Sequence, residues 1–513
     1  MEPRHPRTVA TARTNLPAHY ARIALEMRLG ELELGLLLDP ADVDAAFERA
    51  CVLAALARRE EARRAYHDIL RRRPQHFGAL NNLGMLLYED GSARSALQAY
   101  HLLAERHPDS AMSHTHLAKV LHDEGRSDEA IEHYERALAL DPTAASAHHG
   151  LASILSERGD ETAAAAQRRL GFSYRPVTYS RYLGDREAVR VLLLGVDGQG
   201  NVPTNGFFDD RVFQVASLIV DFYDTDLELP PHDVVFNAIG DADRCALALA
   251  ATNAILARTH APVINHPSAV LATGRAANAD RLGRLSDVVT ARFAMFPRWL
   301  LERTNPVDAL RASGFSWPLL LRVPGYHTGE HFLKVDEPEN VAAALAQLPG
   351  TAVIAIEYLD TRSEDGNFRK YRMIAVDGDL YPLHAAVSKD WKVHYFSADM
   401  QEHAGHRAED AAFLEDSRGV LGSRAYDALR HVVGTLALEY GGVDFALDAK
   451  GRLIVFEANA TMIVPPPPAD SQWDYRRKPV RRIQEAVERM LLGRTRGGYP
   501  LPARDVQAVT YGA

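Results

Sequence analysis

The apolar and small residues in the first third of the chain recur at one fixed interval. Five positions repeat with an offset of 34 residues, namely Leu83 with Leu117, Gly91 with Gly125, Ala96 with Ala130, Tyr100 with Tyr134, and Pro108 with Pro142. The same step leads onward to Leu151, Gly159 and Ala164, and back to Ala62, Tyr66 and Pro74. Small residues let paired helices approach closely, glycine marks the turn between them, and proline stops the second helix. The interval therefore predicts a series of stacked helix pairs.

This segment resembles the tetratricopeptide repeat, most clearly at residues 82–88 (Asn-Leu-Gly-Met-Leu-Leu-Tyr) and 129–138. The resemblance covers residues 45–172, after a leader and a first helix in residues 1–44. It implies an α-helical solenoid that buries a continuous core and exposes a concave surface. In this family the concave surface commonly binds peptides or other proteins. A purely structural or dimerising role is the alternative, and the repeats alone do not decide between them.

After residue 182 the apolar pattern changes to short strands separated by a helix. Residues 188–195 and 234–240 are apolar runs that end in glycine, residues 246–258 predict a helix, and residues 262–265 predict a short strand. This order predicts a small parallel α/β domain over residues 185–275. The loop 198–203 is rich in glycine but lacks the third glycine of a dinucleotide fingerprint. It is either a substrate loop at the carboxyl end of a strand or an ordinary connection.

From Trp317 onward the apolar runs are arranged as hairpins. Strands are predicted at residues 318–323, 332–335 and 352–359, with a helix at 337–348. A hairpin is predicted around Asp377 and Gly378, a strong turn signal, and another around Gly451, between the apolar runs 443–447 and 453–456. Four prolines at 465–468 end this core. A last helix at 479–492 leads to a tail at 496–513 that is expected to be mobile.

Three polar residues of the last hairpin form the tightest constellation in the chain. Asp444 starts the first strand, while Glu457 and Asn459 end the second and lie two residues apart, so they share a face. Folding at the turn brings Asp444 beside Glu457, although 13 positions separate them (457 − 444). Two carboxylates and an amide oxygen are hard ligands that suit Mg²⁺. The hairpin therefore predicts a site for a nucleoside triphosphate held by metal.

Several segments resemble, in this order, the ATP-grasp superfamily, the fold of D-alanine–D-alanine ligase and glutathione synthetase. They are residues 265–268 (Asn-His-Pro-Ser), 318–323, 325–331, 356–359, 371–378 and the hairpin at 443–459. The resemblance covers about residues 185–495 and implies an α/β pre-ATP-grasp domain over 185–275. An α+β ATP-grasp domain would follow over residues 276–495.

The resemblance also implies a role for each matching residue. Asp444, Glu457 and Asn459 would hold Mg²⁺ against the phosphates of ATP. Arg322 stands where the family usually has a phosphate-binding lysine, and a guanidinium can also clamp phosphate. Residues 325–331 would form a flap over the phosphates. The implied ATP-binding residues are Arg322, His327, Gly329, Lys334, Glu357, Tyr358 and Leu359. Arg372, with Arg322, would face the reacting phosphoryl or acyl-phosphate group.

Residues 381–396 are dense in histidine, lysine and aromatic residues. The resemblance places the acceptor substrate or the intermediate there, with the candidates His384, Lys389, Trp391, Lys392 and His394. The alternative is a sheet edge and loop that pack on a neighbouring domain. Plain alternatives also stand for Arg322 and Lys334 as surface ion-pair members, and for Glu357 as a solvated strand end.

The composition indicates which binding partners and which cellular compartment to expect. At 513 residues the chain exceeds a single core, and 47% hydrophobic with 25% charged residues is ordinary for globular proteins. The net charge of −10 argues against nucleic-acid and anionic-membrane partners. Two cysteines provide no disulfide framework, and no apolar run approaches a membrane span. We expect a soluble, cytoplasmic protein.

These observations favour an ATP- and Mg²⁺-dependent carboxylate–amine ligase that forms an acyl phosphate. Its substrates would be a carboxylate and an amine from amino acids or peptides, and the repeats would recruit a peptide or protein. One alternative is an ATP-grasp phosphotransferase. Another is a nucleotide-binding scaffold in which the repeats mediate protein interaction. The sequence leaves open whether the protein forms a homodimer.

Overall fold

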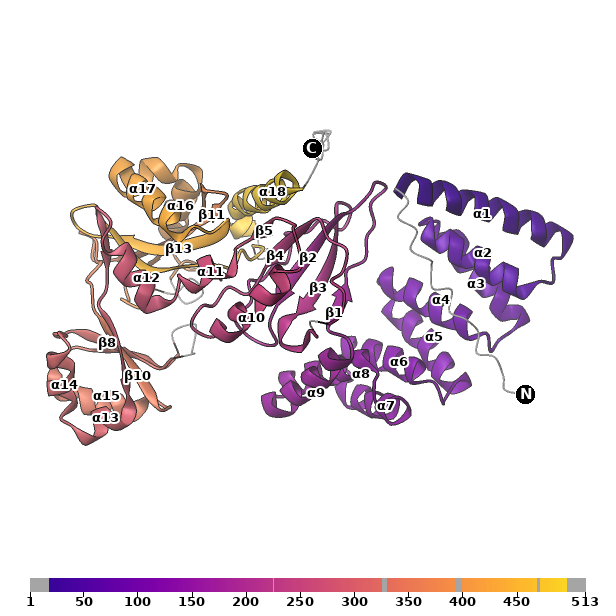
Figure 1. Cartoon of the computed structure of the whole chain (residues 1–513), viewed down its shortest axis with the longest axis horizontal. Helices are drawn as coiled ribbons and strands as arrows, with labels where there is room; N and C mark the ends of the chain where they lie inside the picture. The colour runs from indigo at the N-terminus through magenta and orange to yellow at the C-terminus, as the bar shows by residue number, and fades with distance from the viewer. Residues whose placement is uncertain (1–17, 225, 325–329, 394–398, 468–470, 496–513) are drawn as a thin grey trace. The chain divides into compact units, whose positions relative to one another are not determined.

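The computed structural model describes residues 18–224, 226–324, 330–393, 399–467 and 471–495 (Figure 1). The predictions for the leader, for His327, Gly329 and His394, and for the tail at 496–513 lie outside these residues. Contacts divide the chain into two compact units. The first contains Met1–Val189 and Asp210–Gln214, and the second contains Arg190–Asp209 and Val215–Ala513. Among the described residues, no helix has the length and apolar character to cross a membrane.

The first unit is a series of helix pairs. After α1 (Ala18–Leu38) come the pairs α2 (Val43–Ala55) and α3 (Arg59–Arg72), α4 (Phe77–Glu89) and α5 (Ala93–Arg106), α6 (Ala111–Asp123) and α7 (Ser127–Leu140), and α8 (Ala145–Glu157) and α9 (Glu161–Tyr174). A short strand, β1 (Val177–Tyr179), follows. The repeated alanines are fully buried in this unit, at Ala62, Ala96, Ala130 and Ala164. The stacked helix pairs predicted from the 34-residue interval are therefore confirmed.

The turn inside each helix pair requires a left-handed backbone. Gly91, Gly125 and Gly159 have φ of 73°, 78° and 81°, and the corresponding residue of the first pair is Ala57, with φ of 58°. A side chain in this region costs roughly 1–2 kcal/mol, whereas glycine adopts it freely.

We therefore expect Ala57→Gly to raise the free energy of unfolding of the repeat unit by about 0.5–1 kcal/mol, because strain relief exceeds the extra freedom of the unfolded chain. Helical circular dichroism during denaturant unfolding measures it. Gly125→Ala at the matched turn should have the opposite sign. A loss of stability in Ala57→Gly would contradict the assignment of strain to this turn.

The first sheet has the strand order β1-β3-β2-β4-β5. Its longer strands are β2 (Val189–Gly195), β3 (Phe213–Ile219) and β4 (Val234–Asn237), and β5 (Val263–Ile264) is short. A 3-10 turn at Val220–Phe222 follows β3. The strand β4 pairs in parallel with both β2 and β5, which confirms the predicted parallel arrangement of these strands. The helix α10 (Ala246–Leu256) joins β4 to β5, and α11 (Pro267–Leu271) and α12 (Arg275–Leu282) follow β5.

The second sheet is a small antiparallel one, ordered β7-β10-β8-β9. Its strands are β7 (Phe293–Pro297), β8 (Leu319–Arg322), β9 (Phe332–Val335) and β10 (Ala352–Glu357). The helices α13 (Arg298–Arg303), α14 (Pro306–Ala312) and α15 (Val341–Gln347) accompany it. The predicted helix at 337–348 is shorter than expected, because a 3-10 turn at Pro338–Asn340 precedes α15. Leu310, Leu319, Leu321, Val341 and Val353 form the fully buried centre of this core.

The third sheet carries the candidate site. Its order is β12-β11-β13-β14-β6, with the strands β6 (Val288–Thr290), β11 (Phe368–Val376), β12 (Asp379–Ser388), β13 (Tyr440–Leu447) and β14 (Leu453–Asn459). All neighbours are antiparallel except β14 and β6. Both residues of the turn between β11 and β12, Asp377 and Gly378, have positive φ (52° and 86°), which confirms the predicted hairpin.

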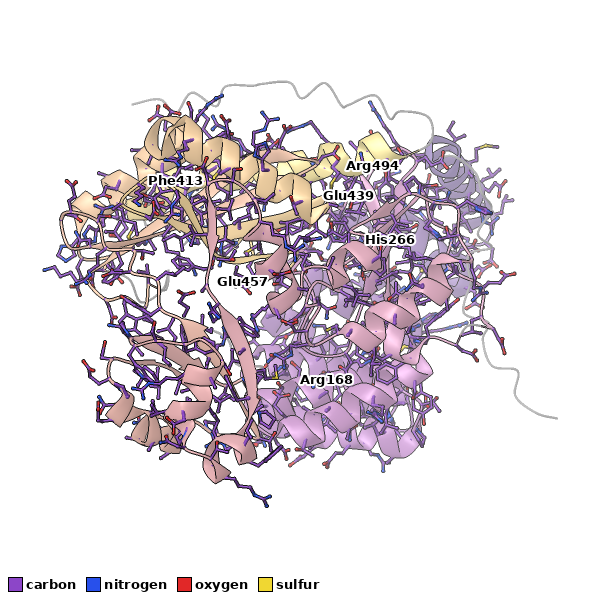
Figure 2. All side chains as sticks on the ribbon, turned by 60° about the vertical axis from the view of Figure 1, so that its left-hand side comes forward. Arg168, His266, Phe413, Glu439, Glu457 and Arg494 are labelled. Carbon is purple, nitrogen blue, oxygen red and sulfur yellow. The ribbon has the colours of Figure 1, made fainter. Side chains whose placement is uncertain are left out.

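Helices cover one face of the third sheet. Figure 1 shows α16 (Ala404–Glu415) and α17 (Ser417–Leu436) side by side over it, with α18 (Arg477–Arg494), after a 3-10 turn at Ser471–Arg476, beside them. Phe413, labelled in Figure 2, projects from α16 to the sheet, where its ring centroid is 5.1 Å from that of Tyr371. Tyr371 in turn stacks on Phe445 of the neighbouring strand at 5.5 Å. Residues that alternate with this aromatic row therefore point to the opposite face.

Candidate functional site

The opposite face of the third sheet carries a row of charged residues across three strands. Arg372 of β11 lies directly opposite Asp444 of β13, and Asp444 lies directly opposite Glu457 of β14. The predicted neighbourhood of Asp444 and Glu457 is therefore confirmed. The register shifts beside this pair, which leaves Phe456 as an additional, 48% exposed residue of β14. This bulge lets Glu457 share the face of Asp444 while Val455 remains in the core.

Asp444 is fully buried and bound by two cations. Nε and Nη2 of Arg372 donate to its two carboxylate oxygens at 2.5 and 2.8 Å, and Nζ of Lys370 lies 2.6 Å from Oδ2. Burial alone would raise the pKa of Asp444, but Lys370 and Arg372 together hold this pKa well below its usual range. Asp444 is therefore a carboxylate at neutral pH, enclosed by positive charge.

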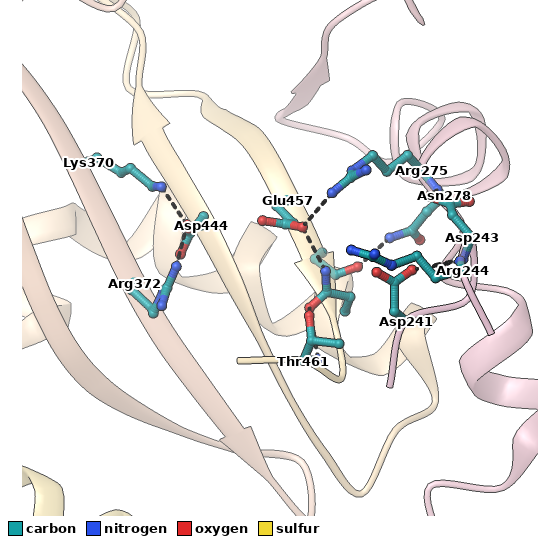
Figure 3. A network of polar contacts seen from close by, with 12 residues as sticks. Asp241, Asp243, Arg244, Arg275, Asn278, Lys370, Arg372, Asp444, Glu457 and Thr461 are labelled. Atoms are coloured by element: carbon teal, nitrogen blue, oxygen red, sulfur yellow. Dashed lines mark hydrogen bonds and ion pairs between the residues drawn. The ribbon is translucent and has the colours of Figure 1, made fainter. Parts of the chain in front are cut away.

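Glu457 has a more open environment. Its side chain is 35% exposed, and Nη2 of Arg275 lies 3.5 Å from Oε1. The Nδ2 group of Asn459 donates to the same oxygen at 2.9 Å. The Oδ1 atom of Asn459 accepts from the backbone N–H and the hydroxyl of Thr461 at 3.0 and 2.9 Å. Figure 3 shows Asp444 between Lys370 and Arg372, and Glu457 turned toward Arg275.

The charges explain how two carboxylates remain opposite each other. Like charges in directly paired positions destabilise a ladder, because their Cβ atoms are only about 5 Å apart. Here Lys370, Arg372 and Arg275 surround the pair with three cations. Within the described residues, no group of three His, Cys, Asp or Glu side chains could hold a metal. Asn459, one of the three predicted Mg²⁺ ligands, is an amide and therefore does not belong to these four residue types. The metal role of Asp444, Glu457 and Asn459 stays a prediction.

The ion pair with Arg275, followed by a series of hydrogen bonds, connects Glu457 to the loops of the first sheet. The Oδ2 atom of Asp243 accepts from the backbone N–H of Arg275 at 3.2 Å. The Oδ1 atom of Asp241 accepts from the backbone N–H groups of Asp243 and Arg244, both at 3.0 Å. Nη1 of Arg244 then donates to Oε1 of Gln199 at 2.7 Å. The glycine-rich loop at 198–203 thus belongs to the same network as Glu457, and its substrate role stays a prediction.

Arg322, at the end of β8, lies in the electrostatic field of Arg275 and Glu457. Burial and the neighbouring Arg275 lower the pKa of Arg322, whereas Glu457 acts to raise it. The guanidinium carbon of Arg322 is 5.8 Å from the ring centroid of Phe332. Arg322, the predicted phosphate clamp, therefore interacts electrostatically with Glu457 and lies beside the ring of Phe332.

Phe332, Tyr358 and Trp391 form an aromatic group. The ring of Trp391 is 5.4 Å from Phe332 and 6.3 Å from Tyr358. Nζ of Lys334 lies 4.5 Å from the centroid of Tyr358 and 2.6 Å from the carboxylate of Asp336. Trp391, a predicted acceptor residue, thus lies with the predicted nucleotide residues Lys334 and Tyr358.

The remaining predicted residues have other surroundings. The Oε2 atom of Glu357 accepts from the backbone N–H of Arg292 at 3.0 Å, so this side chain is not a free, solvated strand end. His384 lies opposite Arg372 and is buried, and burial with the nearby Arg372 lowers its pKa well below the usual value. Leu359 and Lys392 are half-buried, and Lys389 is exposed. Their substrate roles stay predictions.

The sequence did not single out Lys370, Arg275 and Phe332. Lys370 lies two residues before Arg372, where the predicted strand began, and the observed strand starts earlier, at Phe368, so that the two side chains share a face. Arg275 begins α12, about 180 residues before Glu457, and no local pattern connects the two. Phe332 is one apolar residue among many in its strand.

Comparison with known proteins identifies the first unit. Family models described as "Tetratricopeptide repeat" and "TPR repeat" match residues 47–111 and 118–159. The first unit carries tetratricopeptide repeats.

Two solved structures are similar to part of the chain. MamA from Desulfovibrio magneticus RS-1 is 21% identical over 30% of this chain and 88% of that chain, with a TM-score of 0.28. YrrB, described as a TPR protein with an unusual peptide-binding site, is 19% identical over 31% of this chain and 81% of that chain, with a TM-score of 0.27. No curated protein matches the chain.

Proposed function

We propose that the second unit is an ATP- and Mg²⁺-dependent carboxylate–amine ligase of the ATP-grasp type. One observation carries the proposal, namely the pairing of Asp444 with Glu457 on a sheet face where Lys370, Arg372 and Arg275 also converge. Such a face offers oxygen ligands for a divalent cation and positive charge for phosphates. The order of elements, a small antiparallel sheet followed by the site-bearing sheet, supports the same proposal.

Asp444, Glu457 and Asn459 would hold Mg²⁺, since carboxylate and amide oxygens are the ligands this ion prefers. The donor types fit the ion and the two carboxylates are directly paired. Binding would require Asp444 to exchange contacts with Lys370 and Arg372, and Asn459 to exchange its contact with Thr461. When bound, the ion would neutralise charge on the phosphates of ATP. Arg322, Arg275 and Lys334 would add positive charge from the chain itself, so that the triphosphate is positioned by fixed cations.

Tyr358 and Trp391 offer aromatic faces beside Lys334 for the base of the nucleotide. In the proposed reaction a substrate carboxylate attacks the γ-phosphorus, ADP leaves, and an amine then displaces phosphate from the acyl phosphate. Lys370 and Arg372 would stabilise negative charge that develops on the transferred group, because both cations lie on the sheet face that carries Asp444 and Glu457. Exclusion of water would protect the acyl phosphate from hydrolysis.

The repeats suggest a protein or peptide partner, and we propose that they deliver the substrate that the ligase modifies. A concave surface of stacked helix pairs suits such recruitment. The chain would then join recruitment and chemistry in one polypeptide.

The test is a product assay with full-length protein, Mg-ATP and pools of amino acids and peptides. Release of ADP and free phosphate that requires both a carboxylate and an amine would support the ligase. A phosphorylated product with ADP would instead establish a phosphotransferase. Tight binding of ATP without turnover in any pool would establish a scaffold and overturn the proposal.

A further inference from the structure

The helix α1, which precedes the repeats, carries two apolar seams on opposite sides. Leu25, Leu29, Leu32 and Leu36 form the inner seam, where Leu29 and Leu32 are buried in the core of the first unit. Ile23, Met27, Gly30, Leu34 and Leu37 form the outer seam, with successive steps of 4, 3, 4 and 3 residues. This spacing is the one that packs a helix along a second helix.

The outer seam has no such helix among the described residues. Met27, Leu34 and Leu37 are 66%, 62% and 78% exposed, and Ile23 is 41% exposed. Apart from its two chain neighbours and the nearby backbone of α1, a Cβ atom added at Gly30, in the middle of the seam, would meet no atom of the described residues within 4 Å. An end helix of a repeat array normally has a polar outer face. The outer seam is therefore an exposed apolar surface at a position where a repeat array is normally polar.

The borders of the outer seam are acidic. Glu26 and Glu33 lie along one side and Glu31 along the other. Arg28 binds both Glu31 on the seam border, at 2.9 Å, and Glu48 of α2, at 2.8 Å, and Arg49 of α2 binds Glu33 at 3.0 Å. At the start of the seam, Arg22, Ile23, Glu26, Met27 and Asp185 line a pocket of about 440 Å³. The pocket therefore holds two carboxylates, Glu26 and Asp185, and one cation, Arg22.

We infer that the outer seam of α1 binds an amphipathic helix of a partner protein whose apolar stripe is bordered by lysine or arginine. The spacing selects a helix, and the excess of carboxylates (Glu26, Glu31, Glu33 and Asp185) over the cations beside them (Arg22, Arg28 and Arg49) selects basic borders. A second copy of this chain fits less well, because its own glutamates would border the same seam. The chain also has a net charge of −10. This site is separate from the proposed ligase, and its outcome is independent of that proposal.

The probe is a pair of synthetic 21-residue helical peptides with leucine at the same spacing. One peptide has lysine at the border positions, and the other has glutamate. Fluorescence anisotropy with the full-length protein should show binding of the lysine peptide that is at least ten times tighter and that weakens with salt. The double substitution Met27→Glu with Leu34→Glu should abolish it. Met112→Glu, a 49% exposed methionine on α6, is the matched control and should bind as the parent does.

Three results would overturn the inference. The first is equal binding of both peptides, or of neither. The second is a dimer in sedimentation experiments that the double substitution dissociates, because a second copy would then occupy the seam. The third is a melting temperature that the double substitution lowers by more than the control does, because the seam would then be covered within the chain.

Discussion

Asp444→Asn should lower the free energy of unfolding of the second unit by about 3–5 kcal/mol. The substitution keeps the shape of the side chain but leaves Arg372 and Lys370 facing a neutral amide on a buried site. Removing one partner of a buried ion pair typically costs this much, because the remaining charge has lost its compensation. The effect should be fully present at neutral pH, since the folded protein holds the pKa of Asp444 far below its usual value.

Tryptophan fluorescence during denaturant unfolding measures this effect in the correct part of the molecule. The four tryptophans, Trp299, Trp317, Trp391 and Trp473, all belong to the second unit. The matched control is Asp287→Asn, because Asp287 pairs with Arg424 where the two side chains are 35% and 55% exposed. Its loss should stay below about 1 kcal/mol. Equal midpoints for Asp444→Asn and the parent would show that the cluster does not hold the sheet together.

The repeats could be predicted in detail because each one is a local structure and because its sequence pattern recurs several times along the chain. Each turn, buried alanine and terminal proline recurs at the same offset, so one weak signal supports the next. The first pair still departs from the pattern, since Ala57 occupies a left-handed turn that glycine occupies elsewhere. Propensity predicts the usual residue of a turn, and packing of the surrounding helices can impose the same backbone on another residue.

The candidate site was predictable where it depended on a single hairpin. Asp444 and Glu457 lie on adjoining strands joined by a short turn, so their pairing follows from counting residues. The partner of each carboxylate depends on the whole sheet. Arg275 reaches Glu457 from another part of the chain, and Lys370 reaches Asp444 only because β11 pairs with β13. Sequence separation of this size leaves no periodic signal.

The segment at 381–396 is a case in which residue composition alone did not predict burial. Its density of histidine, lysine and aromatic residues predicted an acceptor surface, yet residues 383–388 of β12 are buried. A carboxylate from α16 explains part of this burial, since Oδ1 of Asp410 accepts from the backbone N–H of Ala385 at 2.7 Å. The helix therefore satisfies the edge of the sheet and covers it, which composition alone does not reveal.

Glu457→Gln should reduce ATP-dependent turnover by at least roughly 100-fold while the protein remains folded. Glu457 contributes one of the two paired carboxylates proposed to hold Mg²⁺, and glutamine removes its charge without changing its length. Its partly exposed contact with Arg275 at 3.5 Å contributes little to stability, so the tryptophan unfolding curve should move by less than about 1 kcal/mol. A substitution at Asp444 cannot separate a loss of activity from a loss of stability, because it is expected to destabilise the second unit.

The measurement is ADP release by full-length protein with Mg-ATP and the substrate pool that supports turnover. Glu409→Gln is the matched control, because Glu409 also pairs with an arginine, Arg369 at 2.8 Å, and its side chain is 44% exposed. The control should retain parental activity. Parental turnover in Glu457→Gln would exclude Glu457 from the site. A loss that higher Mg²⁺ concentration partly restores would instead assign the residue to the metal, because a weakened ligand set is refilled by mass action.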